Sequence, residues 1–422
     1  MVTRDGDALW SDFVGWIMES LMSAEEMRLM NSEVSARDLD TTQVFGPEYE
    51  TVFQEAFSVV GDYGQIYERH LARIVPRTTA NTINLGNTPG MFAIALGPLE
   101  LDTIPLSRES PKLKEIIDRG FLKCGITKIP IFAELKNNEW SGLDVDMCRA
   151  VSAAIFDGKT NDVKYQVLTS SERFMAVQNG QVDMLARVST RTLERDVKEP
   201  STGKGLSFSF ANFHDRIRFV GIPTYVQCGE NLDWNSNSCR DLRICVTEST
   251  TQYDILKSLF PDDRLRVMGS STETVENFGK GNCQVFVSGA VEGSEASVRQ
   301  FYSGEFEQGK DLFSRESLSL VTTEEDDLWS KLVNWVLISL FYAEEQGITQ
   351  ATSTLMPRCD LFRPLLSDEF LRNVVRGVGS YKEIWDRNAG SQGLQREGRN
   401  LLNTIPLKPL LMTDLTWDLP IR

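Results

Sequence analysis

Histidine and cysteine, the side chains most often used for metal binding and nucleophilic catalysis, are few or unfavourably spaced in this chain of 422 residues. The only histidines are His70 and His214, which are far apart and form no H-x-x-x-H pair. The seven cysteines form no C-x-x-C pair. A zinc site or a Ser-His-Asp triad therefore lacks the side chains it would need. We expect no metal site, no cofactor and no catalytic residue.

The charge balance argues against several kinds of partner. The 44 Lys and Arg residues and 60 Asp and Glu residues leave a net charge of −16, which repels nucleic-acid phosphates and anionic lipid. The longest apolar run covers only 335–343, whereas a membrane-spanning helix needs about 20 residues. Charged residues interrupt the beginning of the chain, so no secretory signal is visible.

Two stretches of the chain repeat earlier ones at almost the same spacing. DALWSDFVGWIMESLMSAEE at 7–26 matches DDLWSKLVNWVLISLFYAEE at 326–345, and GDYGQIYER at 61–69 matches GSYKEIWDR at 379–387. Such a long offset is a domain period rather than a solenoid repeat. We expect 1–107 to be a partial duplicate of the C-terminal part of a domain that is complete in 108–422. The extra copy is either the remainder of a longer tandem array or a segment that docks on the main domain.

Within the complete copy, the apolar periodicity predicts alternating strands and helices. The first unit has predicted strands at 122–126, 163–168 and 182–186 and predicted helices at 111–119, 143–156 and 171–179. The second unit has predicted strands at 242–247, 265–268 and 284–288 and predicted helices at 251–260 and 272–278. This alternation is typical of parallel sheets covered by helices.

The chain is expected to leave the first unit near 208–220 and to return near 317–323, before a helix at 326–345. A lobe interrupted by a second lobe, with two crossings, forms a cleft over a hinge, and such clefts close on ligands. The predicted fold class is therefore α/β, with two α/β lobes joined by two crossings and with helical extensions. The expected domains are 108–208 with 320–345 for lobe 1, 209–319 for lobe 2 and 346–422 for a C-terminal extension.

Several motifs, taken together and in order, resemble one protein family. They are RGFLKCG at 119–125, WSGLDVDMCRA at 140–150, LTSSERF at 168–174, TRTLERD at 190–196, GIT at 347–349 and GSYKEIWDR at 379–387. The chain from about 112 to 422 resembles the amino-acid-binding receptors of ABC transporters, solute-binding family 3, and most closely the general L-amino-acid-binding type. The resemblance implies a bilobal periplasmic-binding-protein type II fold, a periplasmic or extracellular location, and delivery of an amino acid to a membrane permease without catalysis.

The resemblance also implies the ligand contacts of the first lobe. Arg195 falls on the arginine that forms two parallel hydrogen bonds to the ligand α-carboxylate. The Thr190 hydroxyl and the Val188 backbone N–H fall on donors to the same group. Burying a zwitterion requires partners for both of its charges, and in the family an aspartate of the second lobe pairs with the ammonium.

The second lobe departs from the family pattern. Ser249, Thr250 and Thr251 fall on a Gly-Thr-Thr turn that opens a helix, whose N–H groups favour an anion. Ser249 stands where the family has glycine, and helix capping is the alternative role of the threonines. Gly289 stands at the position of the ammonium-binding aspartate, so no carboxylate is expected there, although Glu292 could reach in.

These departures suggest a changed specificity. A site with Arg195 and without an ammonium partner would suit a carboxylate that has no α-amine. Arg187, Arg191, Arg216 and Arg218 add positive charge near the expected rim of the cleft. The hypothesis is a shift toward a more anionic ligand, or a site that no longer binds.

Six of the cysteines can be paired by their predicted positions. Cys245 and Cys283 lie on neighbouring predicted strands, and the resembled type carries both. Cys124 and Cys148 lie on the first strand and the helix that follows it, whereas Cys228 and Cys239 flank an Asn/Ser-rich loop; Cys359 is left over. This pattern suits an oxidising compartment, with buried free thiols as the alternative.

Three functions remain open from the sequence. The first is a soluble receptor that captures an amino acid or related organic anion for an ABC transporter. The second is a structural or interaction module, cut from a tandem array, whose cleft does not bind; the third is an enzyme on the same fold. The helix at 328–345 is expected to pack on the first lobe and its duplicate at 9–26 to lie elsewhere, which also suggests self-association through the N-terminal copy.

Overall fold

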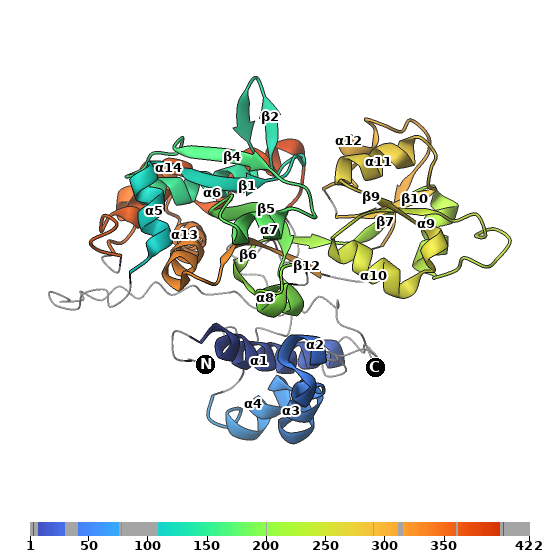
Figure 1. Ribbon diagram of the computed structural model, residues 1–422, viewed down its shortest axis with the longest axis horizontal. Coiled ribbons are helices and arrows are strands. Elements are labelled where there is room, and N and C mark those ends of the chain that lie inside the picture. Colours follow the sequence, from blue (N-terminus) through green and yellow to red (C-terminus); the bar gives the residue numbers. More distant parts are fainter. Residues whose placement is uncertain are drawn as a thin grey trace.

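The computed structural model describes residues 3, 7–29, 41–75, 77, 109–199, 201–289, 291–310, 315–359, 362–396 and 400. The expected junction between the two copies at residue 107 lies outside these ranges. Two α/β lobes lie side by side, and the N-terminal helices lie against the outside of the first lobe (Figure 1). No helix within the described ranges is long and apolar enough to cross a bilayer.

The first lobe is built on a five-stranded mixed sheet with the order β4-β1-β5-β12-β6. β1 pairs in parallel with β4 and β5, whereas β12 is antiparallel to β5 and β6. These strands are β1 (Leu122–Ile126), β4 (Val163–Val167), β5 (Met184–Thr190), β6 (Leu206–Arg216) and β12 (Arg315–Thr323). The expected domain boundaries at 208 and 319 therefore fall inside two of its strands.

Helices cover this sheet and continue into the C-terminal extension. They are α5 (Pro111–Arg119), α6 (Leu143–Ile155), α7 (Arg173–Gln178), α8 (Leu193–Lys198), α13 (Asp327–Glu345), α14 (Phe370–Val378) and α15 (Tyr381–Asn388). One apolar core includes residues of α6, α13, α14 and α15. Asp146 of α6 accepts hydrogen bonds from Arg387 Nε (2.8 Å) and Asn388 Nδ2 (2.7 Å), which join the extension to lobe 1.

The second lobe has a five-stranded sheet with the order β11-β7-β10-β8-β9. Its strands are β7 (Arg218–Gly221), β8 (Ile244–Thr247), β9 (Leu265–Met268), β10 (Val285–Ser288) and β11 (Glu307–Gln308). Its helices are α9 (Pro223–Glu230), α10 (Thr251–Leu259), α11 (Ser271–Gly279) and α12 (Glu295–Val298). Since β6 ends at Arg216 and β7 begins at Arg218, the chain changes sheet at Ile217.

Smaller elements complete the main domain. A hairpin of β2 (Glu134–Lys136) and β3 (Glu139–Ser141) stands out from lobe 1 (Figure 1). Short 3-10 helices are η5 (Asp262–Arg264), η6 (Gln350–Leu355) and η7 (Gly390–Gln392).

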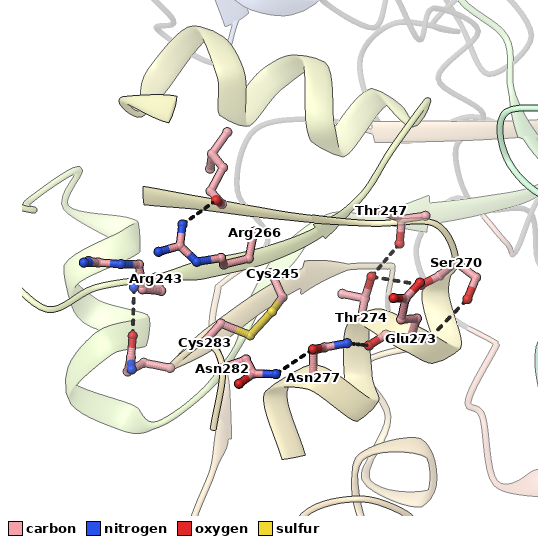
Figure 2. Close-up of a disulfide and its surroundings, with 12 residues drawn as sticks. Arg243, Cys245, Thr247, Arg266, Ser270, Glu273, Thr274, Asn277, Asn282 and Cys283 are labelled. Atoms are coloured by element: carbon pink, nitrogen blue, oxygen red, sulfur yellow. Dashed lines mark hydrogen bonds between the residues drawn. A yellow bond between two sulfur atoms is a disulfide. The ribbon is translucent and has the colours of Figure 1, made fainter. Parts of the chain in front are cut away.

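All three candidate disulfides are present. Cys124–Cys148 joins β1 to α6, Cys228–Cys239 closes the loop after α9, and Cys245–Cys283 joins β8 to the segment before β10. Figure 2 shows the last of these bridges inside lobe 2. Its two Cα atoms lie 5.8 Å apart. Cys359 forms no disulfide and is half-buried. Each bridge therefore lies within one lobe and leaves relative movement of the lobes unconstrained.

The N-terminal copy forms a small helical unit that packs on α8. It comprises α1 (Ala8–Leu29), α2 (Thr42–Phe45), η2 (Pro47–Tyr49), α3 (Val52–Val60) and α4 (Tyr63–His70). Trp16 and Phe53 of this unit share an apolar cluster with Leu193 and Val197 of α8. As expected, α13 occupies the core of lobe 1, while its duplicate α1 lies elsewhere.

Corresponding parts of the two copies make the same contacts. Arg77 forms two hydrogen bonds to the Glu25 carboxylate, and Arg396 forms two to that of Glu344. Arg77 also lies over the rings of Tyr63 and Tyr67, as Arg396 does over the aromatic rings of the corresponding helix α15. A capping box opens both α4 and α15. The repeated sequence therefore folds in the same local way twice.

Candidate ligand-binding site

A pocket lies between the two lobes and beside the crossing strands. Residues from β5, α8 and α7 of lobe 1 line one side, and residues from the start of α10 and from β10 of lobe 2 line the other. Asp215 of β6 and Glu316 of β12 complete it. The lining residues are Ile129, Ser170, Arg173, Arg187, Val188, Thr190, Arg195, Asp215, Thr247, Thr250, Thr251, Gln252, Ser271, Val287, Glu292, Glu316 and Leu318. Five of the seven residues predicted to bind a ligand are among them.

Arg195 is buried and held in place in the first turn of α8. The Thr192 side chain caps this helix by accepting from the Arg195 backbone N–H at 3.2 Å. Arg195 Nη1 donates to the Thr190 carbonyl at 3.1 Å, and the guanidinium carbon lies 5.3 Å from the centre of the Phe174 ring. These contacts fix the direction of the side chain before any ligand arrives.

Arg195 has two cationic neighbours that the motif comparison did not single out as ligand contacts. Arg173 Nη2 donates across the cleft to the Ser249 carbonyl at 3.0 Å, and Arg187 Nε donates to the Leu168 carbonyl at 3.0 Å. Burial lowers the pKa of Arg187 to about 10, although Glu292 and Asp144 oppose this effect. Burial, together with the charges of Arg195 and Arg187, also lowers the pKa of Arg173. Three neighbouring buried guanidiniums destabilise one another, so an anion placed among them would be stabilised.

Glu316 contacts both lobes. Its carboxylate accepts a hydrogen bond from the Thr251 hydroxyl at 2.7 Å and another from the Thr190 hydroxyl. The side chain is only 2% exposed. The two hydroxyls expected to bind a ligand carboxylate therefore bind a carboxylate of the protein itself. No sequence signal pointed to Glu316, which lies in the returning strand far from either threonine in the chain.

Two other predicted contacts have structural roles. The Thr250 hydroxyl accepts from the Tyr253 N–H at 3.2 Å and caps α10, as the alternative interpretation held. The Val188 N–H donates to the carboxylate of Asp144. Burial raises the pKa of Asp144 to about 7, although this hydrogen bond and the charge of Arg187 lower it. Both groups are therefore occupied in this structure.

The serine in the Ser-Thr-Thr turn adopts a conformation that favours glycine. Ser249 has φ = +54°, in the left-handed region that costs non-glycine residues free energy. Val188 has φ = +46°, which is rarer for a β-branched residue. Strain of this kind is concentrated at functional sites, and here it occurs on both sides of the pocket.

The second lobe and the hinge contribute acidic groups. Glu292 lines the pocket, as sequence reasoning allowed, and burial raises its pKa while a hydrogen bond from Ser271 and the charge of Arg187 lower it. Asp215 lies directly against Gly289. Gly289 itself carries no carboxylate, and the neighbouring crossing strand places that of Asp215 beside it. In the part of the chain that the structure describes, no cluster of His, Cys, Asp and Glu could hold a metal ion.

Comparison with known proteins agrees with this architecture. The fold is that of the bilobal periplasmic binding proteins of type II. Residues 122–199 match the family model of bacterial extracellular solute-binding proteins, family 3, and the chain is similar to proteins that are named as amino-acid-binding.

Two curated relatives and one solved structure illustrate the relationship. The general L-amino acid-binding periplasmic protein AapJ of Rhizobium johnstonii is 29% identical over 335 residues, covering 74% of this chain and 94% of that protein. The putative amino-acid ABC transporter-binding protein YhdW of Escherichia coli is 29% identical, covering 69% of this chain and 89% of YhdW. A periplasmic binding protein from Brucella ovis with glutathione bound is 28% identical with a TM-score of 0.56, covering 74% of this chain and 100% of that one.

Proposed function

We propose that this protein captures an amino acid or a related carboxylate between its lobes and presents it to the membrane permease of an ABC transporter. The observation that carries the proposal is the group of three buried guanidiniums, Arg173, Arg187 and Arg195, on one wall of the interlobe pocket. Burying like charges together is costly unless an anion compensates them. A ligand carboxylate bound by Arg195 would supply that charge through a paired hydrogen bond.

Binding would exchange one carboxylate for another. Glu316 now accepts from Thr190 and Thr251, so a ligand carboxylate that uses these hydroxyls has to displace it. Arg173 already connects the lobes through the Ser249 carbonyl. If the lobes close around a ligand, they would therefore rearrange contacts that already join them, as well as form new contacts with the ligand.

A periplasmic or extracellular location follows from the same proposal. Relatives are named as periplasmic binding proteins, and the three disulfides suit an oxidising compartment. We propose binding rather than catalysis because the curated relatives are named as binding proteins. The equivalent Arg77–Glu25 and Arg396–Glu344 pairs support a duplicated origin for the N-terminal unit. Self-association through this unit remains a prediction.

The test is thermal unfolding of the full chain with a panel of amino acids, dicarboxylates and amine-free acids. A ligand at about 100 times its dissociation constant adds about 2.7 kcal/mol to the free energy of unfolding, which is a shift of a few degrees. We expect at least one carboxylate to give this shift, and Arg195→Ala to weaken that ligand by roughly 10- to 100-fold.

Arg266→Ala is the matched control, because Arg266 lies on β9 and is not among the residues that line the pocket. It should leave the shift unchanged. A cooperatively folded protein that responds to no member of the panel would contradict the proposal and favour a non-binding module.

A further inference from the structure

Helix α8 and the residues just before it contact the interlobe pocket on one side and the N-terminal unit on the other. Arg195 lines the pocket, whereas the next residue, Asp196, accepts a hydrogen bond from Trp16 Nε1 of α1 at 2.7 Å. In the same way, Thr190 lines the pocket, whereas Arg191 Nη1 donates to a glutamate of α1 at 2.9 Å. Two pairs of adjacent residues therefore connect the ligand site to the N-terminal unit.

Hydrogen bonds also join the residues on each side of this segment. On the pocket side, Arg195 Nη1 donates to the Thr190 carbonyl at 3.1 Å. On the outer side, Arg191 Nη2 donates to Asp196 at 2.8 Å, and the Arg191 guanidinium carbon lies 4.7 Å from the centre of the Trp16 ring. Because each outer residue is bonded through the backbone to a pocket residue, a change in the contacts of Trp16 is transmitted to the pocket.

The N-terminal unit also supplies apolar surface on which α8 rests. Leu193 and Val197, the apolar residues of this six-residue helix, share one cluster with Trp16, Val44 and Phe53. Leu193, Trp16 and Phe53 are each no more than 1% exposed. A helix this short is not stable in water by itself, so its packing partners determine its conformation. The orientation of α8 therefore depends on the N-terminal unit, whose helices α1 and α2 lie next to it (Figure 1).

We propose that the docked N-terminal unit strengthens ligand binding, with Trp16 as a positioning residue for Arg195. This inference rests on the proposed function of the interlobe pocket. Docking fixes α8 with Arg195 toward the pocket, and release of the unit lets the helix loosen. Coupling between two binding events is reciprocal, so a bound ligand strengthens docking by the same factor. The extra copy then contributes to binding, whatever its origin.

The first experiment is calorimetric titration of the full chain with L-glutamate at one fixed pH. We expect Trp16→Ala to weaken L-glutamate by roughly 5-fold or more, because coupling between sites is typically about 5- to 150-fold. Trp16→Phe keeps a ring in the apolar cluster but loses the N–H donor to Asp196, so its affinity should be intermediate. Trp10→Ala is the matched control, because Trp10 lies on the same helix and is 52% exposed; it should bind like wild type.

The second experiment uses wild type and does not depend on how the variants fold. Amide hydrogen exchange is followed in α1 with and without saturating L-glutamate. We expect the ligand to increase the protection of α1, by about the factor that Trp16→Ala loses in affinity. Amides of the β2–β3 hairpin, on the opposite side of lobe 1 in Figure 1, should exchange at unchanged rates. If Trp16 only supports folding of the N-terminal unit, the ligand would leave the protection of α1 unchanged.

The outcomes separate this inference from the proposed function. If Trp16→Ala binds L-glutamate as tightly as wild type or more tightly, or if the ligand does not protect α1, the inference fails and the receptor function stands. If L-glutamate does not bind to wild type, the amino acid of the panel with the largest thermal shift replaces it in both experiments. If no carboxylate binds at all, the proposed function fails and the inference fails with it.

Discussion

Individual side chains set the charge balance of the interlobe pocket. Three guanidiniums and three carboxylates line it, with Arg173, Arg195 and Glu316 almost completely buried. A buried charge that loses its partner is strongly destabilising. The pocket is therefore stable without ligand only because the protein supplies its own anions.

Glu316 provides a prediction at this scale. Glu316→Gln keeps acceptor oxygen near Thr190 and Thr251 and removes the negative charge beside the guanidiniums. We expect the ligand-free protein to lose about 1.5–3 kcal/mol of stability and the stabilisation by a bound carboxylate to increase, because repulsion from Glu316 is gone. Thermal unfolding with and without ligand measures both effects. Glu139→Gln, on the exposed β2–β3 hairpin, should change neither.

Equal effects of Glu316→Gln with and without ligand would contradict this account. They would mean that the ligand carboxylate does not compete for the contacts of Glu316, and that it binds elsewhere in the pocket.

Among the elements, the turn that opens α10 carries local strain. Ser249 is exposed, has φ = +54° and uses its carbonyl to bind Arg173. Ser249→Gly would remove the left-handed strain while keeping the carbonyl, so we expect a gain of about 0.5–1 kcal/mol in the free energy of unfolding. Chemical denaturation measures it. Ser171→Gly is the control, because Ser171 is exposed and does not have a positive φ, and it should lower the free energy of unfolding. If both substitutions lower the free energy of unfolding, the positive φ of Ser249 does not cost the protein stability.

The two disulfides of lobe 2 allow a matched comparison. Cys245–Cys283 spans 38 residues and Cys228–Cys239 spans 11. Because a longer loop loses more entropy on closure, replacing the first pair by serine should cost about 4 kcal/mol and replacing the second about 3 kcal/mol. Denaturant unfolding of the two variants gives the order. A larger loss from the shorter loop would show that packing around the sulfur atoms, rather than chain entropy, dominates.

At the scale of the whole molecule, the N-terminal unit packs on α8, the helix that carries Arg195 of the interlobe pocket. Trp16 Nε1 donates to Asp196 at 2.7 Å, and Arg191 pairs with Glu19 (2.9 Å) and Asp196 (2.8 Å). Asp196 is adjacent to Arg195 in the same short helix. Docking of the N-terminal unit therefore stabilises the element that positions the principal candidate ligand-binding residue.

The docking interface is also acidic, which makes it sensitive to pH. Burial and the nearby charges of Asp196 and Glu324 raise the pKa of Asp12 to about 8, although Arg191 opposes them. Burial and Asp196 raise the pKa of Glu324 to about 7. An acid whose pKa is raised on folding binds more protons in the folded state, so its contribution to stability falls as pH increases. For Asp12 the window runs from about 4 to about 8.

We therefore expect docking of α1 to weaken between pH 5.5 and pH 8. Amide hydrogen exchange in α1, corrected for its intrinsic pH dependence, should show lower protection at the higher pH. Asp12→Asn should remove most of this difference, whereas Glu55→Gln, on the exposed face of α3, should preserve it. Equal protection of wild type at the two pH values would rule out the mechanism.

The sequence by itself determined the features that depend on local pattern. Apolar periodicity located most of the strands and helices of both lobes to within a few residues, because side-chain period follows backbone geometry. The pairing of Cys245 with Cys283 followed from neighbouring strands. The motif around Arg195 identified one of the three guanidiniums that line the pocket. The repeat at 7–26 predicted a helix that the structure contains as α1.

Only the tertiary structure decided how distant residues share space. Asp215 and Gly289 are adjacent because the crossing strand β6 passes the end of β10, and Glu316 reaches Thr190 and Thr251 because β12 returns between the lobes. Neither arrangement has a sequence signature, since each joins elements separated by tens of residues or more. The packing of α1 on α8 could not be predicted for the same reason, since the two helices are far apart in the sequence. The position of α1 on α8 depends on surface complementarity and on charged pairs between the two, and no local sequence pattern encodes these.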